Sequence, residues 1–182
     1  MRIATATGAL VLVGSVFCSR PSLASDAPAG AEVAGVAGYG VSNGVDVIGP
    51  GLGLRFGYGA TNRVYAGFIG LMHFGSSDPG EPDVRHHSES LRLELGYEID
   101  LLPLDLRPSL RGGITHVATA RDNDGSVWSP DIGLGATLLV RLDGPFLGLD
   151  AEVRYLSNPI YNGDTVVVLG TVAAYWVFGY RF

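Results

Sequence analysis

One short segment brings together side chains that carry out hydrolytic chemistry. His86, His87, Ser88 and Glu89 are consecutive, and a His beside a carboxylate is a general base for a Ser nucleophile. Neighbouring side chains on an extended chain point to opposite sides, however, so His87 and Ser88 do not face each other there. We interpret this segment as part of a solvated loop.

Other polar groups have the residue types of metal ligands. The segment from Asp122 to Ser126 is similar to a fragment of a calcium loop, but a full loop needs a distant Glu and flanking helices. An Asx-Gly pair is also common in hairpin turns, and we predict a turn. His73 and His116 fall within strand-like segments and are predicted at the rim or in the interior. No metal and no cofactor is predicted.

The composition limits which elements position these groups. The chain has 182 residues, a net charge of -6 and a pI near 5.0, and its twelve basic residues are all Arg without a cluster. This balance excludes a typical nucleic-acid binder. Charged residues make up 16% and hydrophobic residues 47%, which excludes a disordered chain. Long apolar runs are too few for several membrane helices of about 20 residues.

The first 24 residues predict a secretory signal peptide. A positive start at Arg2 is followed by an uncharged, mostly apolar run and by small residues at Ser22 and Ala24. We expect cleavage after Ala24, with Ser25 as the alternative. Cys18, the single cysteine, lies in this segment, so residues 25–182 form one domain without disulfides.

The rest of the chain alternates between apolar and small or polar residues with a period of two. Leu91, Leu93 and Leu95, for example, alternate with Arg92 and Glu94. A helix, with a period of 3.6, would mix these faces. The pattern and the turn residues predict eight strands, at 31–42, 50–60, 64–75, 90–101, 106–120, 128–142, 146–157 and 165–182.

The connectors between these strands alternate in length. Three are short, near residues 61–63, 102–105 and 143–145, and four are longer, at 43–49, 76–89, 121–127 and 158–164. Short turns and long loops therefore lie at opposite ends of an up-and-down sheet. We call these ends the short-turn end and the long-loop end.

The faces of the strands favour a barrel that crosses a membrane. The polar face is rich in Gly and carries six Arg against six acidic residues, as enclosed charges require. The apolar face would then meet lipid. We predict that the following charges form a network in the lumen: Glu32, Arg55, Arg92, Glu94, Glu98, Asp100, Arg107, Arg111, Arg141, Asp150, Glu152 and Arg154.

Aromatic residues gather near the predicted strand ends, as they do at the two interfaces of a bilayer. The last strand carries uncharged residues at every second position back from the C-terminal Phe182, including Tyr180 and Phe178. A membrane helix is the alternative for residues 165–182. The predicted girdles consist of Phe56, Tyr58, Tyr65, Tyr97 and Phe146 at the short-turn end, and of Tyr39, Phe74, Trp128 and Tyr155 at the long-loop end.

Two details stay open in the pattern. In the segment 64–75, Val64, Phe68 and Met72 compete with Tyr65, Ile69 and Leu71 for the outward face. In the segment 106–120, Pro108 lacks the N–H that a sheet ladder needs, which allows a local bulge there.

With these features the chain resembles the small bacterial outer-membrane β-barrels: the OmpA transmembrane domain, OmpX and opacity-type proteins. The resemblance implies an all-β, closed, antiparallel eight-stranded barrel in the outer membrane, with periplasmic short turns and extracellular long loops. It also implies that Phe178, Tyr180 and Phe182 are an assembly signal read by the outer-membrane assembly machinery. Outer-membrane lipids and lipopolysaccharide are the implied partners, with an unidentified extracellular partner at the loops.

The same resemblance implies a structural or surface-interaction role, without an open pore, because eight strands leave room only for side chains. Two alternatives are kept. One is a soluble, exported, lipocalin-like barrel with an apolar ligand inside. The other is an enzyme acting on lipid A: Ser157 and Asn158 match the His-x-Ser-Asn pattern of lipid A deacylases, but Tyr155 replaces the His, so the base is missing.

Overall fold

The structure is a computed structural model, which describes residues 29–42, 48–78, 81–120, 126–159 and 166–182. The predicted signal peptide lies outside these residues, as do residues 122–125 of the calcium-like segment. The described chain forms strands only: β1 (Gly30–Ser42), β2 (Pro50–Gly59), β3 (Val64–Asp78), β4 (Glu81–Tyr97), β5 (Ile99–Asp100), β6 (Leu104–Ala120), β7 (Ser126–Arg141), β8 (Pro145–Pro159) and β9 (Val166–Arg181).

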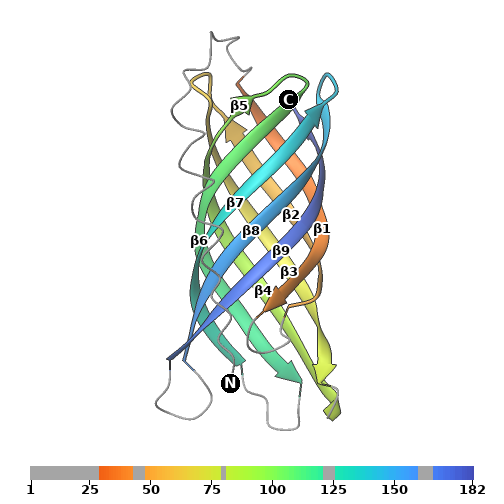
Figure 1. Cartoon of the computed structure of the whole chain (residues 1–182), viewed down its shortest axis with the longest axis vertical. Coiled ribbons are helices and arrows are strands. Elements are labelled where there is room, and N and C mark those ends of the chain that lie inside the picture. Colours follow the sequence, from red (N-terminus) through yellow and green to blue (C-terminus); the bar gives the residue numbers. More distant parts are fainter. Residues whose placement is uncertain (1–28, 43–47, 79–80, 121–125, 160–165) are drawn as a thin grey trace, which may run out of the picture.

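These strands form a closed antiparallel barrel in which each strand pairs with its neighbours in the chain (Figure 1). The two-residue β5 continues β4 beyond Glu98, and both pair with β6, so the wall has eight strands. The first and last strands close the barrel, from the pair Glu32–Arg181 to the pair Ser42–Thr171. The predicted transmembrane eight-stranded barrel is therefore confirmed.

The short-turn end is built as the sequence predicts. Asp143 and Gly144, between β7 and β8, both have positive φ, 47° and 111°, which is the signature of a type I′ hairpin turn. The Leu142 N–H donates to the Pro145 carbonyl across this turn, at 2.8 Å. The start of β1 and the end of β9 lie at this same end, where the Phe182 N–H donates to the Ala31 carbonyl.

Several predicted boundaries are wrong. The segment 76–89, expected as a loop, is largely strand, because β3 runs to Asp78 and β4 begins at Glu81. Its pairing shifts register after Phe74. The predicted strand 90–101 breaks at Glu98. The helix alternative for residues 165–182 is also wrong, since β9 occupies Val166–Arg181. Within the described residues, no helix has the length and apolar character that crossing a membrane requires.

Two open details are resolved by the pairing. In β3, Val64, Phe68 and Met72 face outward, whereas Tyr65 and Ile69 are buried inside. Pro108 causes no bulge against β7, because the register runs through the Pro108–Ala136 pair without a shift. The ladder to β4 and β5 is interrupted beside Pro108 instead. It stops at the pair Gly96–Ser109 and resumes at Ile99–Leu106.

The two faces of the wall are opposite in character. The outward side chains are apolar or aromatic over most of the barrel, and the inward ones include fully buried charged residues. A soluble ligand-binding barrel needs the reverse arrangement, with apolar residues inside, so the lipocalin-like alternative is wrong. The most deeply buried large side chains include five Arg: Arg55, Arg92, Arg107, Arg111 and Arg154.

Candidate functional site

The candidate site is the interior of the barrel, where charged side chains form layers along the axis. The first layer lies at the short-turn end. Arg107 on β6 donates to both oxygens of Glu32 on β1, at 2.9 and 2.8 Å, and to Glu98 at 2.6 Å. Arg181 on β9 donates to the same two carboxylates. This layer ties the closing strands β1 and β9 to the end of β4.

An aromatic ring supports the first layer from inside. Tyr65 on β3 is fully buried, and the guanidinium carbon of Arg107 lies 3.6 Å from the centre of its ring. This distance is that of a cation–π interaction, which is stronger where water is excluded.

Arg111 on β6 is the centre of the second layer. It binds Asp150 in a bidentate manner, at 2.7 and 2.6 Å, and it also donates to Glu152 and Glu94, each at 2.9 Å. Arg55 on β2 also forms an ion pair with Glu94. The side chain of Arg111 requires the space left by a Gly on β7, since a Cβ at Gly135 would lie 2.5 Å from its guanidinium carbon.

The third layer lies toward the long-loop end and is more weakly paired. Arg92 binds both oxygens of Glu152, at 2.9 and 2.8 Å. Among the described residues, Arg154 donates to the hydroxyl groups of Thr171, at 3.3 Å, and Ser90, at 3.4 Å. Among the described residues, no carboxylate oxygen lies within 4.0 Å of Arg154, in contrast to every other fully buried Arg.

Polar pairs and apolar side chains fill the rest of this end. A His73 ring nitrogen and the Tyr175 hydroxyl are 2.9 Å apart, and the Thr115 hydroxyl donates to Asp131. Nearer the long-loop end, an apolar cluster of Ile48, Val117 and Leu156 points inward. The described interior is thus crossed by ion pairs and, nearer the long-loop end, by apolar side chains.

The predicted lumen residues are placed as follows. Ten of the twelve are buried inside, and Arg141 lies partly exposed at the rim, where it pairs with Asp105 at 2.6 Å. The placement of Asp100 is wrong: it is exposed, and its carboxylate accepts the backbone N–H of Leu102 at the turn. The ten buried residues are Glu32, Arg55, Arg92, Glu94, Glu98, Arg107, Arg111, Asp150, Glu152 and Arg154.

Sequence reasoning missed Arg181 and Asp131, both of which are buried inside. Alternation with a period of two would have assigned both residues to the inner face. Arg181 lies between the outward Tyr180 and Phe182, and Asp131 directly precedes the outward Ile132. Two predicted girdle residues are corrected as well. Tyr65 and Phe146 are buried inside, and Phe146 packs in a cluster with Ala34, Leu139 and Val177. The other predicted girdle rings are exposed on the outer wall.

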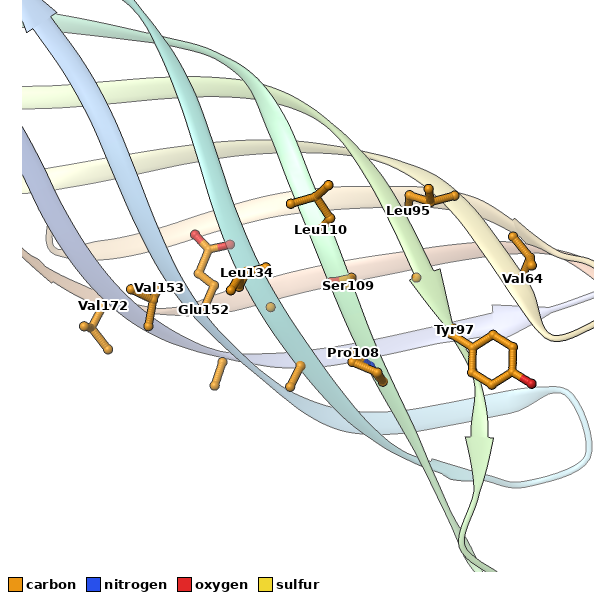
Figure 2. A pocket seen from close by; sticks show the side chains of 14 residues that line it. Val64, Leu95, Tyr97, Pro108, Ser109, Leu110, Leu134, Glu152, Val153 and Val172 are labelled. Carbon is orange, nitrogen blue, oxygen red and sulfur yellow. The ribbon is translucent and has the colours of Figure 1, made fainter. Parts of the chain in front are cut away.

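The outer wall has a groove of about 720 Å³ that extends from the start of β3 across β4, β6, β7, β8 and β9 (Figure 2). Its floor is a row of small outward residues that are partners in register, Pro108, Ala136 and Ala151. A second row of larger partners, Leu110, Leu134 and Val153, borders it. This groove lies in the apolar outer wall, the face that meets lipid in a membrane barrel.

Among the side chains that the structure describes, the candidate hydrolytic groups are not brought together as a site. Tyr155 and Ser157 point outward from β8, Ser88 points inward, and His87 points outward. Among the described residues, no group of three or more His, Cys, Asp or Glu side chains is arranged to hold a metal ion.

Comparison with known proteins supports the fold. No protein-family model matches the chain, and no curated protein sequence matches it. Among solved structures, Neisserial surface protein A is similar with a TM-score of 0.65 and 12% identity over 85% of this chain and 97% of that one. The fold is therefore that of the small barrels of bacterial outer membranes, as the sequence resemblance predicts.

Two further structures show the same fold. The attachment invasion locus protein Ail of Yersinia pestis, in complex with the heparin analogue sucrose octasulfate, has a TM-score of 0.54 and 14% identity over 85% of this chain and 97% of that one. The N-terminal barrel of Pseudomonas aeruginosa OprF has a TM-score of 0.51 and 18% identity over 83% and 97%. Identities this low define the architecture and leave the role to be argued from the residues.

Proposed function

We propose that the chain is an integral protein of the bacterial outer membrane, in which a closed barrel anchors surface segments with a structural or interaction role. The observation that carries this proposal is the interior network. Arg107, Arg111 and Arg92 bind carboxylates from strands across the interior, and buried charges paired in this way are costly to separate. A barrel filled by such pairs is an anchor and not a diffusion pore.

Ion conductance tests whether the interior of the barrel is closed. Purified protein inserted in planar lipid bilayers is expected to give no large, stable single-channel steps at neutral pH. Insertion is checked in parallel by the boiling-dependent change in gel mobility of the same preparation. Large, stable steps from inserted protein would contradict the proposal.

The interaction role is tested at the β3–β4 hairpin, the longest predicted loop. Residues 78–84 lie beyond the register pair Ser77–Arg85. Replacing them with an Asn-Gly turn therefore keeps the pairing of β4 with β6. We expect this variant to assemble normally and to lose the adhesion of expressing cells to host-cell or matrix surfaces. Adhesion that is present and unchanged in the variant would exclude this hairpin as the interaction element.

A further inference from the structure

Among the described residues, the outer wall carries one cluster of polar side chains on a surface that is otherwise almost entirely apolar. Described outward side chains between the two ends are aliphatic or aromatic on every strand. The exceptions lie near the long-loop end. Ser157 on β8 is one, and the other three are His87, Glu89 and His116, which we call the outer polar patch.

The register places the members of this patch side by side. Glu89 on β4 is the direct partner of His116 on β6, and direct partners have Cβ atoms about 5 Å apart. His87 is two residues from Glu89 and shares its face. The next partner along this row is Trp128 on β7. Its ring stacks on that of His116, with centroids 4.6 Å apart and an angle of 29° between the planes.

The ionisable groups of the patch are energetically unfavourable where they lie. Ionisable groups on the lipid-facing side of a membrane protein are unfavourable and are rare without a function. Trp128 and Phe74, a register neighbour of His87, are exposed aromatic residues at this end. The patch therefore lies at the level of a girdle, where lipid headgroups reach the wall.

Among the described residues, no basic side chain forms an ion pair with the carboxylate of Glu89. The buried carboxylates Glu94 and Glu152, by contrast, each pair with two Arg. A headgroup that supplies a positive group to Glu89 would offset the cost of keeping it in the wall.

We propose that the outer polar patch binds a zwitterionic lipid headgroup with a primary ammonium and a phosphate, of the phosphoethanolamine type. Glu89 accepts hydrogen bonds from the ammonium. The N–H groups of His87 and His116 donate to the phosphate, since an imidazole carries at least one donor in either protonation state. Trp128 holds the His116 ring in place by stacking. One carboxylate between two imidazole rings thus matches one ammonium joined to one phosphate.

This inference rests on the proposed membrane location and is tested separately from it. The purified protein in non-ionic micelles is mixed with equal amounts of phosphatidylethanolamine and phosphatidylcholine with identical acyl chains, and bound lipids are counted by native mass spectrometry. The choline ammonium has no N–H to donate, so the two lipids differ at the group that meets Glu89. We expect a preference of about tenfold for phosphatidylethanolamine, the size of one charge-assisted hydrogen bond.

Variants assign this preference to the patch. Glu89→Gln is expected to remove the preference, and His116→Gln to lower the binding of both lipids, because both carry phosphate. Ser157→Ala, an outward polar position on β8, is the matched control and is expected to bind as the wild type does. Equal binding of the two lipids by the wild type, or an unchanged preference in Glu89→Gln, would overturn the proposal. A gel-mobility shift on boiling shows independently that each variant is a folded barrel.

Discussion

At the residue scale, two Arg side chains of equal burial differ in what they pair with. Arg111 and Arg154 are each 1% exposed, but Arg111 binds three carboxylates and Arg154 binds two hydroxyl groups. Removing one partner of a buried ion pair costs about 3–5 kcal/mol, because the other charge stays buried without compensation. We expect Arg111→Met to lower the free energy of unfolding by this amount.

Arg154→Met is the matched control for that prediction. It leaves no carboxylate without a partner among the described residues, and each lost hydrogen bond is worth about 1 kcal/mol. Urea unfolding in phospholipid vesicles measures both variants. Equal losses of stability would show that burial, and not pairing, sets the energy of the interior.

Most of the interior network could be predicted from sequence at this scale, because the period of two assigns each charge to a face. The prediction failed at Asp100, because alternation assigns a residue to the lumen only while the strand continues inside the barrel. The ladder is interrupted at Glu98, and Asp100 lies at a turn. The prediction also failed for Tyr65 and Phe146, because an aromatic residue near a strand end fits either an outer girdle or the interior. Tyr65 packs against Arg107 there, and Phe146 packs in an apolar cluster.

At the scale of the element, β9 is the strand that closes the barrel, and it also carries the predicted assembly signal. Its inward Arg181 binds Glu32 on β1, while its outward rings continue to Phe182, which is exposed and lies 4.9 Å from the Tyr180 ring. Because Phe182 fills no interior space, Phe182→Ala is expected to refold in micelles as the wild type does.

In cells, by contrast, Phe182→Ala is expected to reduce the amount of assembled barrel by more than half, if the assembly machinery reads this ring. Membrane fractions are compared by their boiling-dependent gel shift. Phe74→Ala, an exposed outward ring at the other end of the barrel, is the control. Equal assembly of wild type and Phe182→Ala would exclude Phe182 as the signal.

The extent of the elements was less predictable than their order. The eight strands and the short turns follow from alternation and from turn residues such as Asp143 and Gly144. The segment 76–89 was expected as a loop because it is polar and contains Pro and Gly. Past the pair Phe74–His87, the two strands extend beyond the girdle and need no apolar face. The pattern that identifies a membrane strand therefore disappears there, although the backbone pairing continues.

At the scale of the whole molecule, the apolar outer wall determines how much a charged side chain on the surface lowers the stability of the barrel. Leu93 points outward from β4, between the girdle residue Tyr97 and the level of Phe74, and is 69% exposed. Leu102, at the turn after β5, is 83% exposed. In water, an Arg at either position would change the free energy of unfolding very little. In a bilayer, an Arg near the midplane of the lipid face costs about 2–4 kcal/mol, and one at the interface costs about 1 kcal/mol or less.

We therefore expect Leu93→Arg to lower the free energy of unfolding in phospholipid vesicles by about 2–4 kcal/mol, and Leu102→Arg by about 1 kcal/mol or less. The difference arises because only position 93 lies within the hydrocarbon, although both side chains are exposed and receive the same charge. Equilibrium unfolding in urea measures both variants. Equal, small losses would mean that lipid does not surround β4, and the barrel would then have to be placed in water with its charges inside.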